Sequence, residues 1–149
     1  MAKCGYSLFS PWVVLGAGAA KTALSVLAPS SFGLEAKKLR IGLNGTAAAT
    51  PGLIELLAIS TLGTVTAVTP QQVYGRTVPH GLTAGHTATA EPTVLNVVDS
   101  WPLTPNGGLV LYDYPLGDSP DVGASQGFAI RATFPAAVSV FAGLWVERI

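Results

Sequence analysis

The sequence predicts an all-β protein, a single β-sandwich of jelly-roll type with about eight to ten strands. Short apolar segments are separated along the whole chain by 17 glycines and 11 prolines, which is typical of strands joined by turns. Several segments alternate apolar and polar residues with a period of two, as strands with one buried face do. Helical periodicity is scarce, so an all-β sandwich is the expected class.

The alternation is clearest in Lys38–Leu43, Phe128–Phe134 and Val138–Val146. In the last of these, Phe141 and Trp145 share the face opposite the aliphatic residues, so we expect something to cover them. Turns are expected at Asn44-Gly45, Pro51-Gly52, Asn106-Gly107-Gly108 and Pro135. The expected strands are Tyr6–Phe9, Trp12–Leu15, Thr22–Leu27, Lys38–Leu43, Ile54–Ile59, Val65–Val68, Thr93–Val98, Leu109–Tyr112, Phe128–Phe134 and Val138–Val146.

Two stretches allow more than one interpretation. Leu53 to Ile59 could form a two-turn helix after Pro51, but a strand is favoured because β-branched and polar neighbours follow it. The region from Gln71 to Glu91 is rich in Gly, Pro and small polar residues and holds both histidines. It predicts a long surface loop over residues 70–92.

Residues 1–20 are expected to form an N-terminal arm or strand, and residues 21–149 the β-sandwich domain. Tyr6, Phe9 and Trp12 would anchor an arm on a neighbouring chain, or would belong to a first strand in the core. Both alternatives are open at this point. Gly16-Ala17-Gly18 is interpreted as a hinge between this segment and the domain.

The low charge content limits the classes of partner that the protein is expected to bind. Eight basic and eight acidic residues give no net charge, so no basic face is expected for nucleic acid. Only 11% of the residues are charged, and no run of about 20 apolar residues predicts a membrane helix. We therefore expect the weakly charged surface to be covered by copies of the chain or by another protein.

The chemical motifs are weak. Gly16-Ala17-Gly18 followed by Lys21-Thr22 lacks the glycine spacing of a phosphate loop, and Thr22 to Leu27 has a strand pattern. Ser125 lies in G-A-S-Q-G, but a strand rather than a helix is expected after it. The histidines, His80 and His86, and the lone Cys4 fall short of a metal site. We expect no catalytic residue, metal or cofactor.

Three stretches, residues 21–57, 87–96 and 107–147, resemble small all-β structural proteins of tailed bacteriophages. The resemblance rests on strand punctuation: an Ala-Pro-Ser connection, a Gly-Thr turn, Glu91-Pro92, the Pro115-Leu116-Gly117 turn and "FPAAV". Residues 1–20 lie outside it, and the Gln71–Glu91 region matches only at its end. It implies a virion protein, either a capsid decoration (cement) protein or another minor capsid component.

From the resemblance we expect a non-enzymatic protein on the capsid exterior, synthesised in the host cytoplasm. Its expected partners are the major capsid protein and itself, with a homotrimer favoured for local three-fold positions. The alternative is a tail- or fibre-associated module, or a carbohydrate-binding module that uses Tyr74, Tyr112 or Tyr114. The candidate interface residues are Tyr6, Phe9, Trp12, Tyr74, Arg76, His80, His86 and Trp145.

Overall fold

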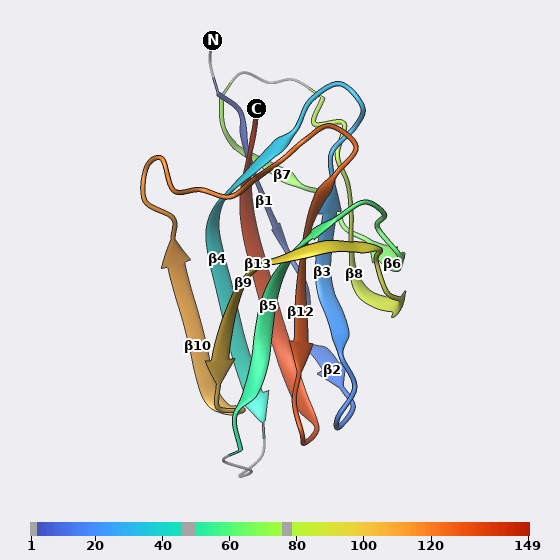
Figure 1. Ribbon diagram of the computed structural model, residues 1–149, viewed down its shortest axis with the longest axis vertical. Helices are drawn as coiled ribbons and strands as arrows, with labels where there is room; N and C mark the ends of the chain where they lie inside the picture. Colours follow the sequence, from blue (N-terminus) through green and yellow to red (C-terminus); the bar gives the residue numbers. More distant parts are fainter. Residues whose placement is uncertain (1–2, 46–49, 76–78) are drawn as a thin grey trace.

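The computed structural model describes residues 3–45, 50–75 and 79–149, and within these ranges the regular structure is entirely strand (Figure 1). The strands of the described ranges are β1 (Gly5–Phe9), β2 (Val13–Leu15), β3 (Lys21–Leu27), β4 (Leu34–Gly45), β5 (Gly52–Ile59), β6 (Thr64–Ala67), β7 (Gln71–Tyr74), β8 (Thr83–Ala90), β9 (Val94–Leu103), β10 (Asn106–Asp113), β11 (Asp121–Val122), β12 (Gly127–Thr133) and β13 (Val138–Arg148). Both termini lie at one end of the molecule (Figure 1). The all-β prediction is confirmed.

Two antiparallel sheets pack against each other with jelly-roll order. One sheet has the order β10-β4-β13-β1-β7, with β2 and β11 attached, and the other has the order β6-β8-β3-β12-β5-β9. Within them, β10-β4-β13-β1 matches β9-β5-β12-β3 strand for strand, because the chain changes sheet between members of each pair. Eight strands paired across two sheets in this way form a double Greek key.

The N-terminal segment is part of the sandwich rather than a free arm. Strand β1 pairs with β13, from Gly5↔Glu147 to Phe9↔Gly143, and β2 pairs with β13 further along. Tyr6 and Leu8 are each 1% exposed and lie in the core. The expected hinge at Gly16–Gly18 is a turn in which the Gly18 N–H donates to the Phe134 carbonyl (2.7 Å). The alternating apolar side chains of this segment face the core, which favours its pairing with the sheet.

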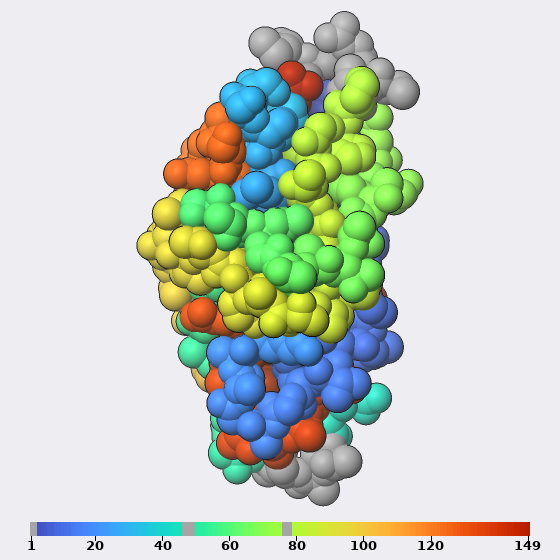
Figure 2. Space-filling model, turned by 90° about the vertical axis from the view of Figure 1, so that its right-hand side faces the viewer, coloured from blue at the N-terminus to red at the C-terminus, as the bar shows by residue number. Residues whose placement is uncertain are grey.

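The region expected to be a long loop over residues 70–92 instead contains strands β7 and β8. Strand β8 lies between β3 and β6, and β7 extends the other sheet beyond β1. This pairing could not be predicted from the sequence, because β8 consists of small and polar residues. A Cβ on Gly85 would lie 2.2 Å from Val65 Cγ2, so glycine permits the close approach of β8 to β6. Figure 2 shows the green and yellow-green residues of β6 to β8 covering this flank.

The remaining strand predictions hold. Strand β5 covers the Leu53–Ile59 stretch, so the helical alternative is wrong there. Lys21 and Thr22 begin β3, as expected, and Ser125 lies in a turn that leads into β12.

Inward-facing residues of both sheets form the core, whose largest fully buried side chains include Tyr6, Phe128 and Phe134. In the described residues, no helix is long and apolar enough to cross a membrane.

Candidate functional site

The outer faces of the two sheets differ in how the chain covers them. Leu57, Ile59 and Ala129 point away from the core of the six-stranded sheet, yet all three are fully buried. Residues 60–64 and 90–94, which we call the strap, cross this outer face (Figure 1). Thr22 N–H donates to both Glu91 oxygens (3.0 and 3.1 Å), and Ser25 Oγ donates to the Leu62 carbonyl (3.4 Å). The chain therefore covers this outer face itself.

The outer face of the seven-stranded sheet carries large aromatic side chains that remain exposed. Phe9 is 40% exposed and lies beside Phe141 and Trp145 of β13, and Trp12 is 53% exposed and lies beside Phe141. We call these four residues the aromatic face. A cluster of exposed aromatic side chains on a small domain is typical of an interaction surface.

The four rings contact one another in sequence. The Phe9 and Phe141 ring centroids are 6.0 Å apart with an interplanar angle of 22°. The Phe9 and Trp145 rings meet edge to face, with centroids 4.9 Å apart, and Trp12 lies 5.9 Å from Phe141. Such contacts stabilise the arrangement by about 0.5–1.5 kcal/mol per pair beyond burial. The aromatic face is consequently ordered before any partner binds.

Gly143 lets the Phe9 ring lie close to the sheet, and the Trp12 ring reaches Gly42. A Cβ on Gly143 would lie 2.7 Å from Phe9 Cδ1, so the Phe9 ring occupies the space above this glycine. A Cβ on Gly42 would lie 3.5 Å from Trp12 Cη2, which places the indole edge over the neighbouring strand. The Phe9 ring therefore lies close to the backbone of β13, and the Trp12 indole lies in contact range of β4.

Arg40 and two leucines extend the aromatic face toward β10. The Arg40 guanidinium lies 5.1 Å above the Trp145 ring and pairs with Asp113 at 2.9 Å. The hydrogen bond from Arg40 lowers the pKa of the Asp113 carboxyl below its ordinary value. Leu109 and Leu111, which pair with Gly42 and Arg40 across the strands, are 61% and 63% exposed. Arg, Trp and Tyr are the residue types that dominate binding energy at interfaces.

A charged cluster closes this face at the end that holds the termini. Glu147 is 4% exposed, its Oε1 lies 2.7 Å from Lys3 Nζ, and Tyr74 donates its hydroxyl hydrogen to Oε2. Burial alone would raise the pKa of Glu147, but the hydrogen bonds from Lys3 and Tyr74 outweigh it and lower the pKa. Burial, followed by the bond to this carboxylate, raises the pKa of Tyr74 well above its ordinary value.

The structure brings three of the predicted interface residues together and separates the others. Phe9, Trp12 and Trp145 meet on the aromatic face, whereas Tyr6 is buried and its ring centroid lies 6.2 Å from that of His80. Tyr74 lies at the sheet edge on β7. His86 lies on β8 and contacts Thr87 (2.8 Å), and Arg76 is outside the described residues.

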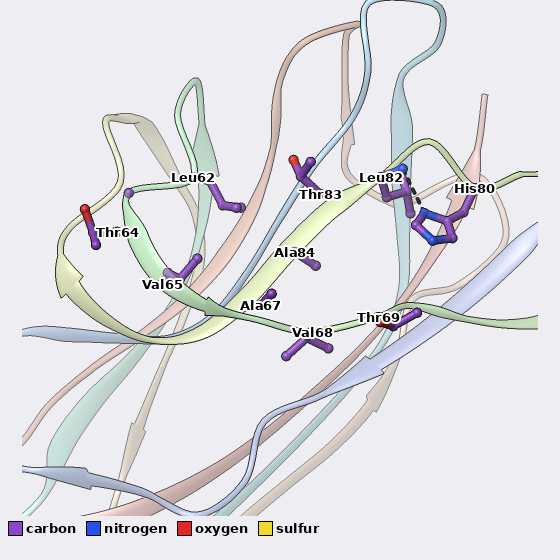
Figure 3. A pocket seen from close by; sticks show the side chains of 11 residues that line it. Leu62, Thr64, Val65, Ala67, Val68, Thr69, His80, Leu82, Thr83 and Ala84 are labelled. Atoms are coloured by element: carbon purple, nitrogen blue, oxygen red, sulfur yellow. Dashed lines mark hydrogen bonds between the residues drawn. The ribbon is translucent and has the colours of Figure 1, made fainter.

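His80 lies in a groove of about 600 Å³ beside β6 and β8 (Figure 3). Its Nδ1 accepts a hydrogen bond from the Leu82 backbone N–H (2.9 Å). The other lining residues are neutral: Leu62, Gly63, Thr64, Val65, Ala67, Val68, Thr69, Leu82, Thr83 and Ala84. Within the ranges described, no three His, Cys, Asp or Glu side chains gather as metal ligands do.

Sequence reasoning missed Arg40, Leu109 and Leu111 as members of this surface. The sequence did predict that Phe141 and Trp145 share one strand face and that something covers them. In the structure, Phe9 packs on both rings and Trp12 packs on Phe141. Leu109 and Leu111 could have been found by the same period-two alternation, since they flank the buried Val110. Comparison with family models and with curated proteins gives no match to this chain.

Proposed function

We propose that the protein is a non-enzymatic structural component of a bacteriophage virion, a decoration protein that binds the outside of the capsid shell and its own copies. The uncovered aromatic face carries this proposal. The chain covers one outer sheet face with its own strap and leaves aromatic and aliphatic side chains exposed on the other. A surface of this kind is stable in water when another protein chain covers it.

The low charge supports the same proposal. Charged residues make up 11% of the chain, and the net charge is zero. Repeated contacts between neutral, weakly charged surfaces avoid the like-charge repulsion that would build up in a shell of many copies. Jelly rolls also serve as viral capsid and lectin domains, a support by analogy of fold alone.

The partners in this proposal are the major capsid protein and further copies of the chain. Neither catalysis nor a cofactor is part of the proposed role. Contacts with the major capsid protein would be made by exposed side chains outside the aromatic face, of which the Leu116 side chain, 96% exposed in the Pro115-Leu116-Gly117 turn, is the most exposed large apolar one described. A rigid sandwich suits this role because its interface backbone needs little rearrangement on binding.

Co-sedimentation tests the proposal. Purified protein is mixed with shells assembled from the major capsid protein of the same genome and is centrifuged, with protein alone as the control. We expect saturable binding, and hundreds of copies per particle when virions are quantified by mass spectrometry. Absence from purified virions would overturn a structural role, and a handful of copies would indicate a tail or vertex position instead of the shell.

The carbohydrate-binding alternative has less support. Tyr74 lies on β7 and Tyr112 on β10, strands at opposite edges of the seven-stranded sheet. The Tyr114 hydroxyl donates to Asp99 Oδ2 (3.1 Å), which fixes that ring at the flank between the sheets. The Tyr112 and Tyr114 rings meet edge to face with centroids 4.8 Å apart, but Tyr74 lies at the opposite edge, so the three tyrosines do not surround one groove. Specific binding on a glycan array would favour this alternative over shell binding.

A further inference from the structure

The aromatic face and the leucines beside it form rows across the seven-stranded sheet. Strand register places Leu111, Arg40, Gly143 and Phe9 in one row. The next row runs from Leu109 through Gly42 to Phe141, beside which Trp12 packs. Each row thus begins with a leucine on β10 and ends with an aromatic ring of the N-terminal segment; Arg40 and Gly143 lie between them in the first row, and Gly42 and Phe141 in the second.

We infer that a second copy of this chain covers the face, in a two-fold contact that packs the leucines of each copy on the aromatic rings of the other. This deepens the self-association that is part of the proposed function and does not depend on binding to a shell. The two-fold axis runs parallel to the strands, between β4 and β13. Strand β10 of one copy then lies over β1 of the second copy, and β4 lies over β13.

The rows are complementary to themselves under this rotation. Leu111 meets Phe9 of the second copy, and Leu109 meets Trp12, in both halves of the contact. An isologous contact of this type forms each favourable pair twice. Because Gly143 leaves room for the Phe9 ring close to the sheet, the two outer faces can approach at the roughly 10 Å spacing of packed sheets.

The charges on the face are compatible with a second copy. Arg40 of one copy lies over β13 of the other, so the two guanidinium groups are offset rather than opposed. Each keeps its own partner, because Arg40 pairs with Asp113 at 2.9 Å and Lys38 lies 3.7 Å from the same carboxylate. No unpaired carboxylate is buried by the contact, and the remaining electrostatic cost, the desolvation of Arg40, Lys38 and Asp113, is offset by the apolar contacts around them.

The area is close to what a stable dimer needs. Phe9, Trp12, Val14, Leu109 and Leu111 together expose on the order of 500 Å² of side chain. The polar residues around them, including Lys38 and Asn44, supply the rest of the roughly 800 Å² that each partner buries in a standard interface. A contact restricted to the leucines or to the rings alone would fall well short of this area.

Sedimentation velocity on the full chain at roughly 100 μM tests the contact. We expect the mass of two chains. Leu111→Lys and Phe9→Glu should each weaken dimerisation by at least about tenfold, since each introduces an unpaired charge into both halves of the contact. Leu116→Lys is the matched control, because Leu116 is exposed but lies on a turn away from this face, and it should leave the dimer intact.

A mixture of the two variants tests the register itself. One half of the mixed dimer keeps the native Leu111 and Phe9 pair, and the other half pairs the introduced lysine with the introduced glutamate. We expect the mixture to recover dimers that neither variant forms alone, with circular dichroism showing that both are folded. A monomeric or trimeric wild-type mass, or a mixture that stays monomeric, overturns the inference. Shell binding by a monomeric wild type would overturn it while leaving the proposed function in place.

Discussion

Tyr74 donates its hydroxyl hydrogen to Oε2 of Glu147, which joins the edge strand β7 to β13 across the end of β1. The Tyr74 ring lies against Gly5, the β1 residue between them in the same row. Lys3 approaches the other Glu147 oxygen at 2.7 Å. One buried carboxylate therefore fastens both the chain start and the inserted strand β7 to the sandwich.

Replacing Tyr74 by Phe removes the hydroxyl and leaves the ring in place. We expect the free energy of unfolding to fall by about 1–2 kcal/mol, because a buried carboxylate loses a charge-assisted hydrogen bond. Urea denaturation measures this change. Tyr112→Phe is a suitable control, since no described hydrogen bond of its hydroxyl is lost. Equal stability of the Tyr74→Phe variant and the wild type would show that the bond to Glu147 contributes nothing.

Stability should also depend on pH through Glu147. Its pKa is lowered in the folded protein, so the folded state binds the proton less tightly than the unfolded chain does. The stabilisation is thus fully present above the ordinary glutamate range near pH 4.3 and is lost as pH falls through the folded pKa. Urea melts from pH 7 to pH 3 should show a steeper loss for the wild type than for Glu147→Gln. Parallel profiles would contradict this assignment.

Gly5 leaves room for the Tyr74 ring, so Gly5→Ala should destabilise the protein. The new Cβ would lie 2.3 Å from Tyr74 Cζ and would push the ring away from Glu147, at a cost of about 1–2 kcal/mol. Gly16→Ala is the matched control, because nothing lies within 4 Å of its Cβ position. It should be neutral or stabilising by up to about 1 kcal/mol. In a Tyr74→Ala background the Gly5→Ala penalty should disappear; if it persists, the ring is not its cause.

The sequence was sufficient for the fold class and for strands with strong alternation. Strands β12 and β13 carry buried residues at every second position, and β4 does so from Leu39 to Leu43, and this period is visible in the sequence. Strand β8 was not predictable in this way. Its segment, Thr83–Ala90, consists of small and polar residues, and what makes it a strand is pairing with β3 and β6, far away in the sequence.

The candidate site was predictable in part for the same reason. Phe141 and Trp145 are on one face of a strand, so their position on the same outer face follows from the alternation alone. The approach of Phe9 and Trp12 to these rings depends on how β1 and β2 pair with β13. Arg40 joins them through the pairing of β4 with β13, which no local pattern specifies.

Gly143→Ala should raise the Phe9 ring from the sheet with little loss of stability. The added Cβ would lie 2.7 Å from Phe9 Cδ1, and an exposed ring can move at small cost, so we expect a loss below about 1 kcal/mol. The movement should change the tryptophan fluorescence, because the Phe9 and Trp145 ring centroids are 4.9 Å apart. An unchanged spectrum together with a loss of several kcal/mol would mean that the backbone, rather than the ring, had moved.

Glu91 holds the strap across the six-stranded sheet, and its removal should loosen that cover. Thr22 N–H donates to both Glu91 oxygens, so Glu91→Ala leaves this N–H without its acceptor and should lower the free energy of unfolding by about 2 kcal/mol. Hydrogen exchange of the Thr22 amide should accelerate, and partial exposure of Leu57 and Ile59 should increase binding of a hydrophobic dye. Glu91→Gln keeps an acceptor oxygen and should recover about half of the stability. If Thr22 exchange stays as slow in Glu91→Ala as in the wild type, the strap is held by its other contacts, such as the hydrogen bond from Ser25 to the Leu62 carbonyl.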